Sequence, residues 1–386
     1  MFPFGKIEHL VDRLRQIETH AALRGIAAIL VVGYHLQFLH RGAEGLSILA
    51  PMFARSYLLV DLFFILSGFI LSYVNRADSP AAIGALSYRG FIARRLIRLY
   101  PLLLFSIICL IILRIAATMA ASMIDRPAFY TWDTESVSIL ASQLAMVNAW
   151  TLLPTGWNTP TWSISAELFA YLLFPGLALL LARRPRVTLV VLTIAAALFY
   201  SVVGSTGGSL DIVSFPAPFR CLAGFCLGMA IYALRDTIAR LPVVLLSALQ
   251  IIALIASVTI LFLPVNDVLI IPAFVVLVAT TWTDRGVLAR VLRVRPLLYL
   301  GDISYSVYLM HIPVLDTLGL VWWQTVGKIG LTGFAGGLVW VATSYAATIL
   351  VSHLTFTLLE VPARRRLTRR FLGQRAGPIA LSPSAP

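Results

Sequence analysis

An arginine and a histidine share one face of the first apolar segment of the chain. Arg24 lies near the start of the run AALRGIAAILVVGYHLQFLH, and His35 follows eleven residues later. In a helix these eleven residues turn through about 1,100°, or almost three turns, so both side chains point the same way, roughly 16 Å apart along the axis. Ionisable groups inside an apolar span are expensive and by default indicate a functional site.

A second polar stripe lies in the segment NTPTWSISAELFAYLLFP. Ser163, Glu167 and Tyr171 are spaced i, i+4 and i+8, so a helix presents them on one face. A lone buried carboxylate would cost several kcal/mol or take up a proton unless it is paired. Glu167 is therefore either a functional group or a structural residue, which forms a hydrogen bond or an ion pair with Arg114 or Arg220.

The segment LGDISYSVYLMHIPV carries a third stripe. Gly301, Ser304, Tyr308 and His311 recur at helical spacing on one face. His311 is either a second residue of the pocket or a histidine that hydrogen-bonds to a neighbouring helix.

Asp61 lies near the outer end of the second apolar segment, YLLVDLFFILSGFILSYV. The first two segments run antiparallel, so this carboxylate could reach the depth of His35 and hold the imidazole in one tautomer. Alternatively Asp61 stabilises the start of its own helix, where an acid suits the positive end of the helix dipole.

The segment FIARRLIRLYP supplies a cluster of positive charge. Arg94 and Arg98 are one turn apart and share a face, whereas Arg95 is expected to point elsewhere. Such a segment can meet lipid headgroups, or it can bind a phosphorylated nucleotide, because the arginine fork matches phosphate oxygens.

The elements that must hold these side chains are membrane spans. Hydrophobic residues make up 59% of the chain, charged residues 12%, and the mean hydropathy is +0.90, whereas about a quarter of a soluble domain is charged. We predict an all-α integral membrane protein, a bundle of about ten transmembrane helices of roughly 18–25 residues each. Their predicted centres lie near Ile29, Leu66, Ile111, Ala170, Thr193, Leu227, Ile255, Val275, Val307 and Ala346.

Charge predicts the orientation. With ten spans both termini lie on one side, and the segments on that side hold 24 of the 30 lysines and arginines. Because basic loops stay in the cytoplasm, we predict that both termini are cytoplasmic and that the chain is a multi-pass protein of the inner (cytoplasmic) membrane. The net charge of +13 follows from this topology, so the lipid bilayer is an expected partner and nucleic acid is not.

Three regions are expected along the chain. Residues 1–20 have an apolar stripe typical of an amphipathic helix on the inner leaflet. Residues 21–362 form the transmembrane domain, and residues 363–386 a basic and then disordered cytoplasmic tail. The three cysteines fall in predicted spans without metal-ligand spacing, and we expect no metal.

Six blocks in this order resemble those of membrane acyltransferase family 3. They are LRGIAAILVVGYHL, VDLFFILSGFIL, RRLIRLYP, TPTWSISAELFAYLLFP, LGDISYSVYLMHIP and EVPARR. The resemblance runs from about Thr19 to Arg364. The family commonly has Phe-Tyr after the glutamate of the fourth span, where this chain has Ala170-Tyr171; we expect this difference to alter packing and not chemistry. Some members carry an extracytoplasmic esterase-like domain, which is not expected within these residues.

The resemblance implies an enzyme. Members of the family O-acylate polysaccharides, lipopolysaccharide, Nod factors and macrolides. The implied reaction transfers an acyl group, acetyl on family frequency, from cytoplasmic acyl-CoA (acetyl-CoA) to a hydroxyl of an extracytoplasmic or lipid-linked carbohydrate. Arg24 and His35 match the pair regarded as essential in the family, and Trp162 and Glu167 match its WSxxxE block. Nothing in the sequence indicates the acceptor or the oligomeric state.

These residues combine into a hypothesis for the site. His35 would deprotonate the acceptor hydroxyl, with Arg24, Glu167 and Asp61 as further catalytic residues. The CoA phosphates would bind three arginines: Arg24, Arg94 and Arg98. The expected substrate-binding residues are Trp162, Ser163, Tyr171, Tyr308 and His311. The alternative function is a transporter or flippase of a polar glycoconjugate, which would also place charged residues along a central path.

Overall fold

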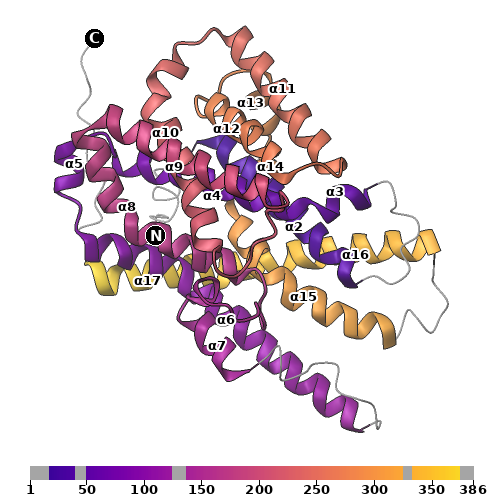
Figure 1. Ribbon diagram of the computed structural model, residues 1–386. Coiled ribbons are helices and arrows are strands. Elements are labelled where there is room, and N and C mark those ends of the chain that lie inside the picture. Colours follow the sequence, from indigo (N-terminus) through magenta and orange to yellow (C-terminus); the bar gives the residue numbers. More distant parts are fainter. Residues whose placement is uncertain (1–16, 40–48, 124–135, 325–332, 374–386) are drawn as a thin grey trace, which may run out of the picture.

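A computed structural model describes residues 17–39, 49–123, 136–324 and 333–373, and over these ranges the chain is a bundle of helices without strands (Figure 1). The longer helices are α2 (Glu18–Leu39), α4 (Leu59–Asn75), α6 (Tyr88–Met123), α8 (Thr161–Arg183), α9 (Pro185–Ser205), α10 (Ala217–Ala239), α11 (Val243–Phe262), α12 (Ile270–Thr281), α15 (Ser304–Gln324), α16 (Gly333–Thr355) and α17 (Val361–Leu372). Short helices connect them: α3 (Ala50–Ala54), α5 (Pro80–Gly84), α7 (Val137–Leu144), α13 (Val287–Leu292) and α14 (Arg295–Asp302). There are also 3-10 turns at Ser56–Leu58, Asn148–Trp150 and Asp267–Leu269, and a π-helical turn, η6 (Phe356–Glu360), joins α16 to α17.

The all-α membrane class is confirmed, although fewer spans qualify than predicted. Eight helices of the described ranges are long and apolar enough to cross a membrane. The spans predicted near Val275 and Val307 correspond to α12 and α15. Helix α12 has only 12 residues, and α15 carries several polar side chains in its 21 residues. Most of the amphipathic segment predicted for residues 1–20, and the tail beyond residue 373, lie outside the described residues.

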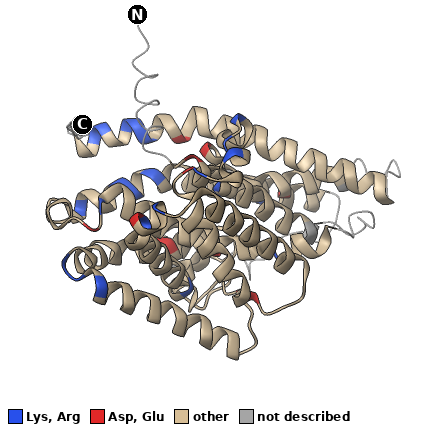
Figure 2. Ribbon diagram, turned by 90° about the horizontal axis from the view of Figure 1, so that it is seen from above, with Lys and Arg blue, Asp and Glu red and all other residues tan. Residues whose placement is uncertain are grey.

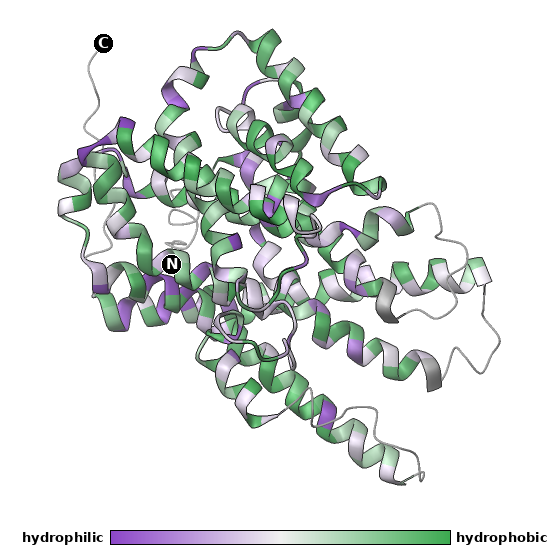
Figure 3. Ribbon diagram, in the orientation of Figure 1, coloured by the Kyte–Doolittle hydropathy of each residue, from purple (hydrophilic) through white to green (hydrophobic). Residues whose placement is uncertain are grey.

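The outward surfaces of α6, α9 and α11 are apolar (Figure 3). Ile112, Leu198 and Ile252, one on each helix, are each more than 60% exposed. Large apolar side chains with this exposure suit contact with lipid tails, which are as apolar as leucine.

Glycines bring two pairs of helices into backbone contact. A Cβ atom added at Gly68 of α4 would lie 2.0 Å from the Phe225 carbonyl oxygen of α10, and one at Gly228 of α10 would lie 2.1 Å from the Ile65 carbonyl oxygen. Gly301 of α14 meets α2 in the same way, 2.3 Å from the Ala21 carbonyl oxygen. Close approach through small residues is the usual way in which membrane helices pack.

The start of α2 is held by an acid from a distant segment. Asp284 accepts hydrogen bonds from the backbone N–H groups of Thr19 and Glu18, at 2.9 and 3.3 Å. A carboxylate at a helix N-terminus satisfies orphan N–H groups and suits the helix dipole. Together with the contact at Gly301, this cap fixes the height of α2 and therefore of Arg24 in its second turn.

Basic residues gather in one half of the bundle. Figure 2 shows most of the blue lysine and arginine positions on its left side, whereas the long tan helices extend to the right. This distribution is what the positive-inside rule requires of one membrane side. That this side is cytoplasmic stays a prediction.

Candidate active site

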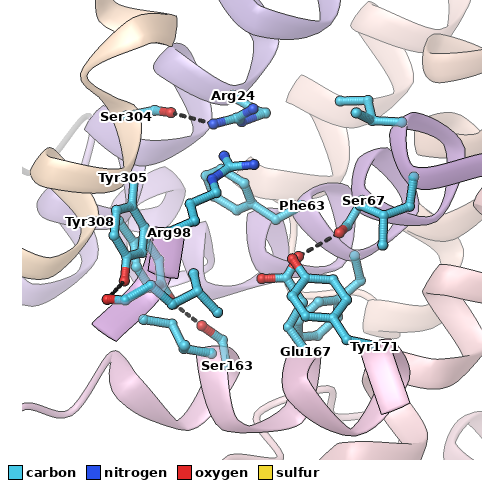
Figure 4. A pocket seen from close by; sticks show the side chains of 15 residues that line it. Arg24, Phe63, Ser67, Arg98, Ser163, Glu167, Tyr171, Ser304, Tyr305 and Tyr308 are labelled. Carbon is cyan, nitrogen blue, oxygen red and sulfur yellow. Dashed lines mark hydrogen bonds between the residues drawn. The ribbon is translucent and has the colours of Figure 1, made fainter. Parts of the chain in front are cut away.

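A pocket lies between α2, α4, α6, α8 and α15 and encloses about 100 Å³ (Figure 4). Its polar lining consists of Arg24, Ser67, Arg98, Ser163, Glu167, Tyr171, Ser304, Tyr305 and Tyr308.

Two guanidinium groups lie side by side at one end of the pocket (Figure 4). Arg24 donates a hydrogen bond from Nη2 to the Ser304 hydroxyl at 3.1 Å. Within the described ranges, neither Arg24 nor Arg98 forms a salt bridge with a carboxylate. Two such cations facing one cavity make an anion site, because each can offer a planar fork of N–H donors.

The neighbouring arginines of α6 differ from the sequence expectation. Arg94 is exposed and does not line the pocket. Arg95 instead places its guanidinium 5.6 Å from the Phe91 ring centroid and 6.0 Å from that of Tyr171, which lines the pocket. Arg95 and Arg98 are spaced i and i+3, which also puts two side chains on neighbouring parts of one face.

Glu167 lies across the pocket from the two arginines (Figure 4). Its Oε1 accepts a short hydrogen bond from the Ser67 hydroxyl, and the Tyr171 ring lies beside it. The two structural partners proposed from the sequence are engaged elsewhere: Arg114 donates to the Trp157 carbonyl oxygen at 2.8 Å, and Arg220 binds Asp61. Glu167 therefore fixes the Ser67 hydroxyl at the wall of the pocket.

A tyrosine connects the pocket to two histidines. Tyr308 shares a 2.7 Å hydrogen bond with Ser163, and its ring centroid lies 6.1 Å from that of His311. His311 Nε2 is 3.2 Å from His35 Nδ1. His35 itself does not line the pocket, so the histidine pair lies one aromatic ring beyond it.

Within the described residues Asp61 hydrogen-bonds to Arg220 and Tyr200, and no hydrogen bond joins it to His35, so a catalytic role for Asp61 stays a prediction. Its Oδ2 accepts a hydrogen bond from Arg220 Nη2 at 2.7 Å, and both side chains are fully buried. Asp61 occupies the first turn of α4, as the helix-start alternative predicted. Trp162, expected to bind substrate, is also outside the pocket: the Arg220 guanidinium lies 5.1 Å from its ring.

The family model described as an acyltransferase domain, that of acyltransferase family 3, matches residues 21–357. The chain belongs to this family. This acyltransferase is thus an enzyme that transfers acyl groups, and its apolar helices make it a multi-pass membrane protein. The predictions of family, enzyme class and membrane O-acyltransferase are confirmed.

This acyltransferase is similar to several known proteins, among them the following three. Acyltransferase MdmB of Streptomyces mycarofaciens is 29% identical, over 96% of this chain and 96% of its own length. YrhL of Bacillus subtilis (strain 168), named as a candidate peptidoglycan O-acetyltransferase, is 25% identical over 94% of this chain and 57% of its own. The O-acetyltransferase OatA of Staphylococcus aureus is 24% identical over 90% and 57%. The chain thus spans little more than half of the last two. No solved structure matches this chain.

The pocket of this acyltransferase also contains residues that sequence reasoning left out of the site. Ser304 and Tyr305 at the start of α15 line it, and the Tyr305 hydroxyl donates to the Leu99 carbonyl oxygen at 2.6 Å. Behind them Glu360 of η6 accepts a hydrogen bond from Ser306 at 2.8 Å. The stripe through Ser304 was a signal for the first of these residues. No three His, Cys, Asp or Glu side chains within the described ranges are grouped as a metal site requires.

Proposed function

We propose that this membrane O-acyltransferase takes an acyl group, acetyl in the first instance, from acyl-CoA on the cytoplasmic side and transfers it to a hydroxyl of a carbohydrate on the outer side. The observation that carries the proposal is the pair Arg24 and Arg98. Both face one pocket, and neither is neutralised by a carboxylate salt bridge in the described part of the chain.

The donor occupies the pocket with its charged end at the arginines. The CoA phosphates accept hydrogen bonds from Arg24 and Arg98, and charge-assisted bonds of this kind are about twice as strong as neutral ones. Both arginines lie in the early turns of their helices, α2 and α6, at the membrane side predicted to be cytoplasmic. The pantetheine arm runs along α2 toward His35, a rise of roughly 16 Å.

His35 acts as the general base. It takes the proton of the acceptor hydroxyl as the oxygen forms a bond to the thioester carbonyl carbon. The carbon–sulfur bond then breaks, and the protonated imidazole returns the proton to the departing thiolate. Glu167 keeps Ser67 at the wall beside the donor, and Tyr171 completes this wall.

A carbohydrate acceptor is supported by relatives that cover most of this chain. YrhL carries a name that refers to peptidoglycan, whose acylated groups are sugar hydroxyls. The predicted topology places the donor entrance and the outer loops on opposite sides of the bilayer. The reaction then carries an acyl group across the membrane.

Purified protein in lipid nanodiscs tests the donor. We expect it to bind acetyl-CoA and to release free CoA, measured by calorimetry and by thiol titration. Arg24→Lys should weaken acetyl-CoA binding about tenfold or more, since a hydrogen bond to a charged group contributes about 1.5–3 kcal/mol. The matched control Arg94→Lys, at an exposed arginine outside the pocket, should bind like the parent protein.

Two outcomes would refute this proposal. Equal affinity in Arg24→Lys and the parent protein would remove the phosphate site from the pocket. The flippase alternative would be favoured if the protein released no CoA in nanodiscs and, reconstituted in vesicles, moved an intact glycoconjugate across the bilayer.

A further inference from the structure

Two imidazoles meet where α2 packs against α15. His311 Nε2 lies 3.2 Å from His35 Nδ1, and the ring centroids are 4.8 Å apart with the planes tilted by 55°. His311 is fully buried, whereas His35 is partly exposed. His311 is therefore the more deeply buried ring of the pair.

Backbone carbonyl groups determine where the protons of this pair lie. His311 Nδ1 is 3.1 Å from the Val307 carbonyl oxygen, and His35 Nδ1 is 3.1 Å from the Val31 carbonyl oxygen. A carbonyl oxygen only accepts, so each Nδ1 carries its hydrogen. In neutral His311 the other nitrogen, Nε2, then has a free lone pair, and the single hydrogen on His35 Nδ1 is shared between this lone pair, at 3.2 Å, and the Val31 carbonyl oxygen.

We propose that His311 is a positioning residue that, together with the Val31 carbonyl oxygen, holds His35 in the tautomer with a bare Nε2, and that it stabilises the imidazolium form of His35. The inference rests on the proposed function and deepens it. In that reaction the hydroxyl proton moves to His35 Nε2, the ester C–O bond forms, the C–S bond breaks, and the same proton leaves on the thiol. While His35 is charged, its Nδ1–H bond to His311 becomes charge-assisted and stronger.

Aromatic rings flank the pair on both sides. The Tyr34 ring centroid lies 5.0 Å from that of His35, and the Tyr308 ring centroid 6.1 Å from that of His311. No aspartate or glutamate hydrogen-bonds to either imidazole within the described ranges. A neutral histidine therefore takes the place that a carboxylate holds in a Ser-His-Asp triad.

Two substitutions at one position separate hydrogen bonding from ring packing. His311→Gln keeps an acceptor, Oε1, near the place of Nε2, whereas His311→Phe keeps a ring and removes the acceptor. In acetyl-CoA turnover by the purified protein, we expect His311→Phe to lower kcat by roughly 10²-fold or more, the scale of general-base catalysis. His311→Gln should stay within about tenfold of the parent, and KM for acetyl-CoA should change in neither variant.

Full kcat in His311→Phe would overturn the proposal, as would equal losses in both variants. A raised KM with unchanged kcat would instead make His311 a donor-binding residue. If the role is merely structural, less folded protein is recovered, but the activity of each folded molecule does not change.

Nitrogen-15 NMR of the histidine-labelled protein measures the tautomer of His35 and does not depend on enzymatic turnover. The expected spectrum assigns to His35 a protonated Nδ1 and an unprotonated Nε2, and a proton on Nε2 of neutral His35 would refute the proposal. The variant His35→Ala is the control for the proposed function. If it retains parental turnover, the general base is wrong, whatever the spectrum shows for His311.

Discussion

The buried pair of Asp61 and Arg220 provides a prediction whose size follows from the structure. The carboxylate accepts from Nη2 at 2.7 Å and from Nε at 3.2 Å, and neither side chain is exposed. Removal of one partner leaves a charge in the bundle without compensation, which costs about 3–5 kcal/mol. Asp61→Leu and Arg220→Met should each lower the free energy of unfolding by this amount.

The double variant should be far less damaged than the sum of the two single variants. With both charges gone, an apolar pair of similar volume fills the site, a replacement that is often neutral. The carbonyl oxygens of Tyr57 and Ile212 lose the guanidinium donors that they have at 3.4 and 3.3 Å, at about 1 kcal/mol each. The Tyr200 hydroxyl also loses its bond to Asp61, at 3.4 Å. We therefore expect a double-variant loss of about 3 kcal/mol and a coupling energy of at least about 3 kcal/mol.

Reversible unfolding by sodium dodecyl sulfate in mixed micelles measures these values. The control is Asp236→Leu, which breaks a surface pair with Arg235 in which Asp236 is 72% exposed, and a loss of about 1 kcal/mol or less is expected. A loss in the double variant equal to the sum of the two single-variant losses would refute the reasoning. An Asp61→Leu protein with parental stability and no transfer activity would instead support a catalytic role for Asp61.

Three further predictions concern the pocket, the helix contacts and the topology. Glu167→Gln should lower acetyl transfer with little change in unfolding in detergent; unchanged transfer would place Glu167 outside the mechanism. Gly68→Ala should destabilise the bundle, because its new Cβ would overlap α10, whereas Gly176→Ala, with open space around it, should be neutral; equal stability of both would contradict the close contact. In a background without native cysteines, an impermeant maleimide added to cells with a permeabilised outer membrane should label Ser138→Cys and spare Ser87→Cys, both at exposed positions. Labelling of Ser87→Cys alone would show that the topology is the inverse of the predicted one.

Local spacing was enough to predict much of the pocket. Ser163, Glu167 and Tyr171 belong to one helix, so the period of 3.6 residues places them on one face wherever that helix packs. All three line the pocket, as do Ser304 and Tyr308 of the stripe on α15. The apolar runs likewise indicated the eight helices that can cross a membrane, because a run of hydrophobic residues needs no partner to be recognised; α12 and α15 are the two predicted spans that do not qualify.

Partners far apart in the sequence could not be predicted in this way. Arg220 is 159 residues from Asp61, and His311 is 276 residues from His35. Which two side chains from different helices come into contact depends on how those helices cross. The periodicity within one helix carries no information about the crossing. Periodicity also could not show where the pocket ends. It puts Arg94 on the face of Arg98, but only Arg98 lines the pocket.

The glycine contacts between α4 and α10, and between α2 and α14, bear on how such a chain can change in evolution. Residues facing lipid need only stay apolar, so one can replace another there with little effect. At Gly68, Gly228 and Gly301 even one methyl group would meet backbone, so the geometry leaves no such freedom. An architecture held by a few points of backbone contact can persist while most other positions drift.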